Sequence, residues 1–549
     1  MKYLFLLTIT PVQDFISHAR KLKDLYGGSH ILSEMSRVGV EYAQNRGAVV
    51  IFPKKVEGTN SYPNRFLIEI SFESEEKLKA FANGVSSEIL SYFRNLNRTK
   101  SLIVSEHVEN FFQIYWSASE YNGDYEEAYN KVEKRLAGAK NSRFFTQLGE
   151  VGRKCSICGE RNIAVYRDKH HKNPKKRMKF YIEKQRDNLL LIRDNLLQNS
   201  EGLCGVCYMK RISKVKSFDS TADISIMNIP LEIREKQNYL HNDSQLFYEE
   251  NLNQSYFDKN DIDYPLIECQ KEHKEFTKEI KDKYKQTSYY AVVMFDGDDM
   301  GKWLSGQKLN DMSKLKEFHE DISLNLATFA KKAKEILQEP KGMTVYAGGE
   351  DFLGFVNINN LFEVIRELNS EFTKLISQPL KKKYSITDNF TFSAGVVIAH
   401  YKTPLGTVLN EARKSEKKAK KNSDKDSVCL TVLKRSGEIR ETVLKFDDFF
   451  ELEYIIEQLN ENFSDKFISN LEKEFLLMYN KEAKDEEKNR INSLIFVELE
   501  RLLNRSVKND KAKKNIEKIK DAIEKTYSIE FRNFIDGLYI CRFINKEIR

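Results

Sequence analysis

Three carboxylates stand beside strand-like segments of the 549-residue chain, in the motifs Asp296-Gly-Asp-Asp and Gly-Gly-Glu350-Asp351. A hard divalent cation such as Mg²⁺ (or Mn²⁺) takes oxygen ligands and is usually held by one or two carboxylates together with substrate phosphates. The two motifs therefore indicate a nucleotidyl-transferase metal site, with Asp296, Glu350 and Asp351 as catalytic residues and Mg²⁺ ligands.

The elements around these residues must bring them together. Residues 289–295 are β-branched, aromatic and apolar, which is typical of a strand buried on both faces. Two short apolar runs, 343–347 and 352–357, flank paired glycines and favour a hairpin, because glycine accepts the positive φ of tight turns. Apolar residues at helical spacing within 312–338 predict a crossover helix. Strand, helix and hairpin in this order predict a palm domain.

Each motif alone has an ordinary explanation. An isolated Asp-Gly-Asp-Asp is most often a solvated turn, and an isolated Gly-Gly-Glu-Asp is most often an acidic hairpin. Both motifs follow predicted strands, about fifty residues apart, and this arrangement favours the metal site instead.

Longer motifs resemble those of one family. Phe-Asp-Gly-Asp-Asp-Met-Gly-Lys (295–302), Tyr-Ala-Gly-Gly-Glu-Asp-Phe-Leu (346–353) and Ser-Ala-Gly-Val-Val-Ile-Ala-His-Tyr-Lys-Thr-Pro-Leu (393–405) resemble the large polymerase/cyclase subunit of type III CRISPR effector complexes. Residues 9–29, beginning Ile-Thr-Pro-Val-Gln-Asp-Phe-Ile, resemble its type III-B (Cmr) branch. One departure is Glu350, where the family commonly has Asp; because related diguanylate cyclases have Glu here, we expect activity to survive.

The resemblance implies an α+β fold with two ferredoxin-like, nucleotide-cyclase-like palm domains. Its expected parts are a degenerate N-terminal palm (1–150), a zinc-binding and linker domain (151–285), a catalytic palm (286–435) and a C-terminal helical bundle (436–549). It further implies that target RNA activates the catalytic palm to join ATP into cyclic or short oligoadenylates. The implied partners are other type III-B subunits (a Cas5-like neighbour and a small helical subunit), guide RNA and target RNA.

Further residues are candidates for nucleotide binding. Backbone N–H groups of residues 297–301 could cradle phosphates. Lys420, in a basic helix predicted over 406–421, becomes a triphosphate clamp by resemblance, although composition equally favours a solvated helix. Ser393 matches a family position near the adenine base, and Leu304 replaces the Asn with which diguanylate cyclases read guanine. The candidates are Gly297, Asp298, Gly301, Lys302, Gly348, Gly349, Ser393, Lys420, Arg20, Gly28 and Ser29.

The N-terminal region repeats the order of the predicted palm without its acids. A strand (2–9), a helix (29–44) and two strands (48–52 and 66–71) around a Pro-Asn-Arg turn are predicted, with Thr8 and Thr10 where the metal-binding Asp would stand. A repeat with one carboxylate-free copy indicates a binding half and a catalytic half. By resemblance the first half holds the acceptor nucleotide, through Arg20, Gly28 and Ser29.

Two Cys-x-x-Cys pairs, Cys155/Cys158 and Cys204/Cys207, supply the four thiolates of a tetrahedral structural Zn²⁺ site. Redox pairs or disulfides fit less well with three further scattered cysteines, at 269, 429 and 541. Between the two pairs, residues 153–184 carry eleven Lys or Arg against three acids. This surplus predicts either contact with RNA phosphates or a loop kept soluble by its charge.

Composition bounds the remaining expectations. No run reaches the ~18 apolar residues of a membrane span, and no signal peptide is recognisable, so we expect a cytoplasmic protein without membrane contact. No His is directly followed by Asp in the sequence, which predicts the absence of the family's histidine-aspartate (HD) nuclease domain. Residues 238–263 predict an extended surface segment, and the apolar periodicity after Phe446 predicts helices.

Three functional hypotheses stay open. The first is an RNA-activated adenylyl polymerase within a type III-B complex. In the second, the same palm transfers the adenylyl group to another small nucleotide-like acceptor, since the sequence does not specify which acceptor the pocket of the first palm selects. The third is a non-catalytic scaffold that holds guide and target RNA.

Overall fold

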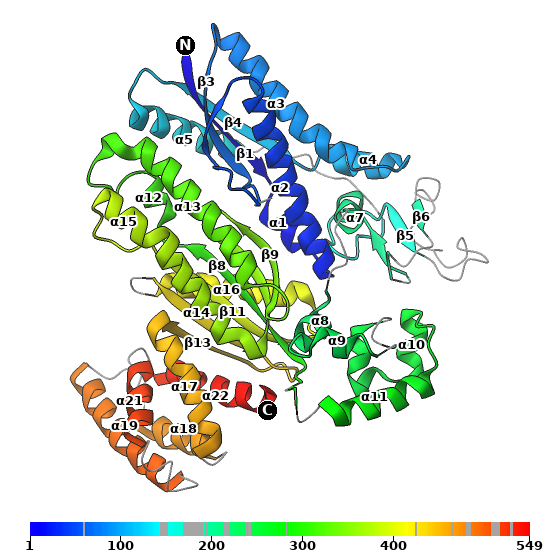
Figure 1. The fold of residues 1–549 in the computed structure, drawn as a ribbon, viewed down its shortest axis with the longest axis vertical. Helices are drawn as coiled ribbons and strands as arrows, with labels where there is room; N and C mark the ends of the chain where they lie inside the picture. Colours follow the sequence, from blue (N-terminus) through cyan, green and yellow to red (C-terminus); the bar gives the residue numbers. More distant parts are fainter. Residues whose placement is uncertain are drawn as a thin grey trace.

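The computed structural model describes the chain except residues 59–60, 143–151, 168–189, 193–195, 199, 214–218, 238, 240–242, 281–282, 285, 423–424, 463–465, 479–484, 507–515, 528–530 and 549. It is an α+β protein, as predicted, with two palm-like sheets, a cysteine-rich module and a C-terminal group of helices (Figure 1). Within the described residues, no helix is both long and apolar enough to span a membrane.

The first sheet has four strands in the order β2-β3-β1-β4. The central strand β1 alternates sharply: Tyr3, Phe5 and Leu7 face one hydrophobic core, and Leu4 and Leu6 face another. Alternation of this kind is expected for a strand covered by helices on both sides. The elements are β1 (Lys2–Thr10), α1 (Gln13–Ser17), α2 (Leu22–Gln44), β2 (Val49–Phe52), β3 (Arg65–Ser71), α3 (Glu75–Asn95), α4 (Leu102–Glu109), β4 (Gln113–Glu120) and α5 (Tyr125–Asn141).

The second sheet has six strands in the order β13-β12-β11-β8-β10-β9. Helix α16 covers β11, β12 and β8, and α13 packs against β9. The elements are β8 (Tyr289–Gly297), α12 (Met300–Leu304), η5 (Met312–Lys314), α13 (Leu315–Ile336), β9 (Gly342–Gly348), β10 (Asp351–Asn357), η6 (Ile358–Asn360), α14 (Leu361–Phe372), the π-helical η7 (Thr373–Ser377), α15 (Gln378–Tyr384), β11 (Phe392–His400), α16 (Leu405–Lys421), β12 (Ser427–Leu433) and β13 (Ile439–Lys445).

The two sheets share one topology. The order β2-β3-β1-β4 corresponds to β9-β10-β8-β11, and in each sheet the first strand pairs antiparallel with both neighbours. The repeat predicted from the sequence is therefore present. The halves are joined through a common core, because α5 of the first palm and α13 of the second contribute to the same hydrophobic cluster.

A cysteine-rich module follows the first palm and packs beside α2 (Figure 1). Its short sheet has the order β6-β5-β7. Its elements and those that lead to the second palm are β5 (Val165–Arg167), β6 (Leu190–Ile192), β7 (Gly202–Leu203), α7 (Gly205–Ile212), α8 (Thr221–Ile226), α9 (Leu231–Arg234), η3 (Ser244–Phe247), η4 (Glu249–Asn251), α10 (Gln254–Asn260) and α11 (Leu266–Ile280).

The extended segment predicted over 238–263 is wrong for the described part of that range. Leu246 and Phe257 lie in the short helices η3 and α10, and Leu252 directly follows η4. These three residues form a small buried cluster with Tyr239 and with Cys269 of α11. The many Asn, Asp and Gln residues suggested an exposed chain, but a few well-spaced apolar residues are enough to pack these turns.

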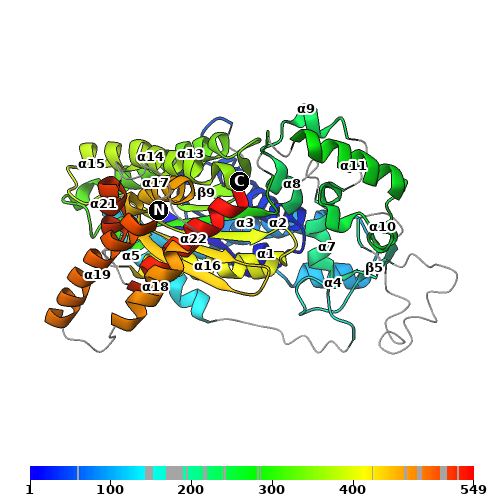
Figure 2. The same ribbon diagram turned by 90° about the horizontal axis from the view of Figure 1, so that it is seen from below.

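The C-terminal region is helical, as its periodicity predicts, and lies across the molecule from α10 and α11 (Figure 2). Helix α22 packs on β13, where Asp536 Oδ1 accepts from Arg440 Nη1 at 2.6 Å. These helices are α17 (Phe446–Asn462), α18 (Phe467–Met478), α19 (Asp485–Ser506), α21 (Ile516–Tyr527) and α22 (Phe531–Ile548).

Candidate active site

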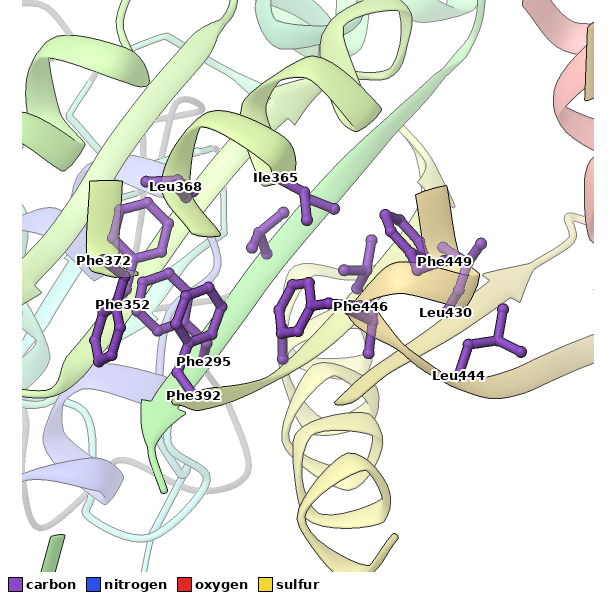
Figure 3. Packing of buried hydrophobic residues seen from close by; sticks show 14 of the residues in the cluster. Phe295, Phe352, Ile365, Leu368, Phe372, Phe392, Leu430, Leu444, Phe446 and Phe449 are labelled. Carbon is purple, nitrogen blue, oxygen red and sulfur yellow. The ribbon is translucent and has the colours of Figure 1, made fainter. Parts of the chain in front are cut away.

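Three neighbouring strands of the second palm end at a stack of phenylalanine rings (Figure 3). Phe295 lies with its ring centroid 4.8 Å from that of Phe352 and 4.1 Å from that of Phe392. Phe295 pairs with Phe352 in the antiparallel register between β8 and β10. Asp296 follows Phe295 and Asp351 precedes Phe352, so the two acids lie at the same end of this strand pair. Packing of the buried rings therefore fixes the positions of the backbone residues that carry the acidic side chains at this edge of the sheet.

Glu350 lies in the turn of the β9–β10 hairpin, whose neighbour Gly349 has φ +62°. Its carbonyl accepts from the Gly297 N–H at 3.2 Å. A Cβ on Gly297 would lie 3.0 Å from Glu350 Cβ and 2.9 Å from Met300 Cγ. Glycine at 297 thus lets the hairpin turn approach the end of β8.

The acids of this edge repel one another. Burial and the neighbouring Asp351 raise the pKa of Glu350 to about 7, and burial raises the pKa of Asp351 to about 6 although part of its side chain is open to solvent. On α16, burial and Asp351 raise the pKa of Glu416 to about 7. A bound cation would stabilise the ionised forms of these groups, so the donor set suits Mg²⁺.

The predicted convergence of all three carboxylates is incomplete in this structure. Asp296 forms an ion pair with Lys420, which also lies 3.4 Å from Glu416 Oε1. Within the part of the chain that the structure describes, Asp296, Glu350 and Asp351 do not form a cluster whose ligand atoms all lie within 4.8 Å. Lys420 thus contacts the carboxylate of Asp296 rather than open solvent, and a cation that uses Asp296 must compete with that ammonium.

Ser393 and Asp298 contact each other instead of opening into a nucleotide site. Ser393 is fully buried, and its hydroxyl donates to Asp298 Oδ1 at 2.9 Å. Asp298 also accepts from Thr391 Oγ1 at 2.8 Å and from the Asp426 N–H at 3.1 Å. In this structure the Ser393 hydroxyl therefore holds the turn after β8 to the strand edge, and its place near an adenine base stays a prediction.

The turn predicted to bind phosphate, residues 297–301, is accessible to solvent where α12 begins. A Cβ on Gly301 would meet no atom within 4 Å, so this turn is accessible. Lys302 is exposed and pairs with Asp299 at 3.1 Å, and Lys425 approaches the same carboxylate at 2.7 Å. Contact with Lys425 lowers the pKa of Asp299 to about 2. At Gly348, a Cβ would lie 3.0 Å from Ser61 Oγ of the first palm, so this glycine allows the two palms to approach.

Two cavities lie beside the hairpin that carries Glu350 and Asp351. One, of about 180 Å³, is lined by Asp296 and Asp351 and by Ser29 of α2. The other, of about 160 Å³, is lined by Glu350 and Asp351. Residues of the first palm complete the walls of both cavities, so both lie between the palms.

Several cavity residues were missed by the sequence analysis. Asn64 lines both cavities, Arg65 lines the cavity beside Glu350, and Arg413 of α16 lines the one beside Asp296. Asn64 and Arg65 belong to the Pro-Asn-Arg turn, whose sequence differs from the catalytic hairpin by its missing acids and carries no other signal of a site. For Arg413 a signal existed, since Arg413, Glu416 and Lys420 recur at helical spacing and share a face of α16.

The remaining candidates in the first palm have other contacts. Arg20 is half exposed, lies 3.9 Å from Glu201 and lines neither cavity described above. Gly28 is buried, and a Cβ there would lie 3.1 Å from Lys210 Cδ of the cysteine-rich module. Of the three residues nominated to hold the acceptor, only Ser29 reaches the site.

The four cysteines converge as predicted. The Sγ atoms of Cys155, Cys158, Cys204 and Cys207 all lie within 4.8 Å of one another, and three of these residues are buried. Cys204 and Cys207 lie at the start of α7, and the first pair lies in the turn before β5. Four soft donors around one point suit a tetrahedral metal ion and leave no open coordination position.

Comparison with known proteins finds related families for two separate parts of the chain. Residues 289–429 match the family model of the Cas10/Cmr2 second palm domain, and residues 4–97 match that of the CRISPR-associated protein Cmr2 N-terminal region. The CRISPR system Cmr subunit Cmr2 of Pyrococcus furiosus is 25% identical over 79% of this chain. The chain spans 62% of that relative's length.

Solved structures share the fold. A type III-B Cmr-beta complex bound to cognate target RNA contains a chain that matches with TM-score 0.63 and 14% identity, over 100% of this chain and 83% of the other. The apo state of Cmr-beta gives TM-score 0.62 and 15% identity, over 100% and 82%. An apo Csm1-Csm4 cassette gives TM-score 0.52 and 12% identity, over 100% and 70%. The motifs and the two family models thus make the chain similar to the Cas10/Cmr2 family over those residues, and the solved structures share its fold.

Proposed function

We propose that this chain is the nucleotidyl-transferase subunit of a type III-B CRISPR complex and converts ATP into oligoadenylate-type messengers when target RNA is bound. The observation that carries the proposal is the placement of Asp296, Glu350 and Asp351 at one sheet edge, beside cavities walled by both palms. A scaffold would not require these mutually repelling acids at an open edge.

A metal ion is part of this proposal. Asp296, Asp351 and Glu350 would hold Mg²⁺ (or Mn²⁺), which when bound neutralises triphosphate charge and lowers the pKa of an attacking ribose hydroxyl. Glu350 is either a third ligand or the base, and its pKa of about 7 suits a group that accepts a proton near neutrality. Lys420 neutralises Asp296 in this structure and would contact the triphosphate once Asp296 binds the cation.

The first palm supplies the acceptor side. It brings Asn64 and Arg65 to the cavity that contains Glu350, and Ser29 to the cavity that contains Asp296. Arg65 is a cation beside the hairpin, which suits contact with a phosphate. Leu304 at the position of a guanine-reading Asn favours adenine as the base.

The partners are proposed from the relatives. Cmr-beta is described as bound to cognate target RNA, and we assign guide RNA, target RNA and neighbouring Cmr subunits to this chain on that basis. The division at about 150, 285 and 435 belongs to the same proposal, as does Zn²⁺ as the ion of the four cysteines. Most of the basic segment 153–184 lies outside the described residues, so its contact with RNA stays a prediction.

The test is product identification. The assembled complex is incubated with target RNA, Mg²⁺ and labelled ATP, and the products are identified by mass spectrometry. Oligoadenylates that require target RNA and disappear in the Asp296→Ala/Asp351→Ala variant are the expected result. An adenylylated product of another mass would point to a different acceptor, and RNA binding without any product would indicate a scaffold.

A further inference from the structure

Helix α7 connects the cysteine cluster to the first palm. It begins immediately after Cys204, whose Sγ accepts from the Cys207 N–H at 3.4 Å, and its residues from Gly205 to Arg211 are all buried. The helix packs against α2 and α4. Two of its buried residues, Lys210 and Arg211, are charged, and burial of such groups is costly unless they are paired or hydrogen-bonded.

Lys210 holds the end of α1. Only 1% of its surface is exposed, and its Nζ donates to the Phe15 carbonyl at 2.7 Å and to the His18 carbonyl. The ammonium also lies 5.2 Å from the centroid of the Phe15 ring. These carbonyls belong to the last turn of a five-residue helix, which could not stay folded in this position without tertiary contacts.

Two adjacent glycines of α2 make room for this lysine. A Cβ on Gly27 would lie 2.4 Å from the Lys210 carbonyl oxygen, and a Cβ on Gly28 would lie 3.1 Å from Lys210 Cδ. Glycine is unfavourable inside a helix by ~1 kcal/mol. The close contact with α7 explains why both positions carry it.

Arg211 holds the start of α2. Its Nη2 donates to Asp24 Oδ2 at 2.9 Å and its Nη1 to Glu201 Oε2 at 3.3 Å, and all three side chains are buried. Asp24 Oδ2 also accepts from the N–H groups of Arg20 and Lys21, at 3.1 Å and 3.0 Å. The backbone between α1 and α2 is thus fixed at both ends by two consecutive residues of α7.

The segment fixed in this way is a wall of the candidate active site. The helices that it joins line the 180 Å³ cavity with Asp296 and Asp351, α1 through Val12, Gln13 and Ile16 and α2 through Ser29. We propose that Lys210, with Arg211 behind it, is a positioning residue that sets this wall for nucleotide binding. The inference rests on the proposed function, since it deepens the role of the same cavity.

The test compares four variants of the full-length chain. Lys210→Met removes the ammonium but keeps the length of the side chain, and Lys210→Arg restores a donor. Gly28→Ala places a methyl against the lysine stem. Lys77→Met is the matched control for loss of a lysine, because Lys77 is an exposed residue of α3 that pairs with Glu73. Binding of an ATP analogue with a non-hydrolysable α–β bond, the bond that the proposed reaction breaks, is measured by calorimetry, and thermal unfolding is measured in parallel.

We expect Lys210→Met to weaken analogue binding at least fivefold and Gly28→Ala to weaken it less. Lys210→Arg should recover most of the affinity, and Lys77→Met should match the wild type. In the assembled complex, Lys210→Met should raise the ATP concentration for half-maximal rate with kcat within about twofold of the wild type.

Other outcomes would overturn the inference. These are unchanged affinity in both Lys210→Met and Gly28→Ala, or a loss that Lys77→Met shares or that Lys210→Arg does not recover. If Lys210→Met does not fold, the affinity of Gly28→Ala decides. A wild-type chain that binds the analogue but makes no product in the complex would refute the proposed function alone, because the binding series does not depend on turnover.

Discussion

Thr8 lies opposite Arg65 in the register between β1 and β3, the strand pair that corresponds to β8 and β10 of the second palm. The same strand pair therefore carries two acids in one palm and a hydroxyl with a cation in the other. Arg65 lines the cavity beside Glu350 and acts to lower the pKa of that carboxyl, although burial and Asp351 outweigh it. Where the second palm carries acids, the first palm thus presents a cation to the cavity beside Glu350.

Arg65→Gln should shift the pH dependence of the reaction. Without the guanidinium, the pKa of Glu350 rises further, so the acidic limb of the pH profile of kcat should move to higher pH. Because Arg65 is the smallest of the contributions to this pKa, the movement should be less than about one pH unit. A pH–rate profile of the complex measures it. Arg46→Gln, which changes an arginine that stacks on Tyr42 away from the site, is the control and should leave the profile unchanged. An acidic limb that moves to lower pH would contradict the assigned electrostatics.

Cation binding should strengthen as pH rises. The pKa values of Glu350 and Asp351, at about 7 and about 6, lie above those of free carboxyls, so both groups hold protons in the folded chain where they would already have lost them in the unfolded chain. Their protonation favours the folded state at low pH, and this contribution is lost as pH rises toward 7.

Mn²⁺ affinity, measured by calorimetry between pH 5.5 and 8, should therefore increase by about tenfold or more across this window. The Glu350→Gln variant should show a smaller increase. A pH-independent affinity in the wild-type chain would mean that these carboxyls are not the ligands.

Lys420→Met should separate two roles of this lysine. Because Lys420 pairs with Asp296, its removal should strengthen Mn²⁺ binding to the chain without nucleotide. Because a charge-assisted contact with phosphate is lost, the ATP concentration for half-maximal rate should rise about tenfold. Lys421→Met, an exposed neighbour, is the matched control. Weaker Mn²⁺ binding after Lys420→Met would contradict the competition proposed here.

Ser393→Ala tests whether this residue serves Asp298 or the nucleotide. The substitution removes one of three hydrogen-bond donors to buried Asp298, so it should lower the free energy of unfolding by about 1–3 kcal/mol. Denaturant unfolding measures this loss. ATP affinity should stay within about twofold of the wild type; a tenfold loss of ATP affinity without a change in stability would support the predicted place of Ser393 near the adenine base.

Cys155→Ser should reduce the bound zinc of the purified chain from about one ion per molecule, as measured by elemental analysis. Loss of a closed four-thiolate site removes its binding energy from folding, so the melting temperature should fall by several degrees. Cys269→Ser changes a buried cysteine outside the cluster and should leave the zinc content unchanged. Equal zinc content in the wild type and Cys155→Ser would refute the zinc site.

Local pattern was sufficient for much of the second palm. The apolar run before Asp296 and the paired glycines before Glu350 correctly predicted β8 and the β9–β10 hairpin, because strand alternation and turn geometry depend on near neighbours in the sequence. The same reasoning failed over residues 238–263, where a few apolar side chains outweigh a polar composition.

The amino-acid sequence by itself determined which residues are candidates for metal binding and in which order the palm elements occur, since both follow from residue type and short-range spacing. Only the tertiary structure decided that Ser393 serves Asp298, that Arg65 lines the cavity beside Glu350, and that Lys210 reaches across to the Phe15 carbonyl. Each of these arrangements joins elements far apart in the chain. Their partners depend on how helices and sheets pack, and no periodicity within a single element records that.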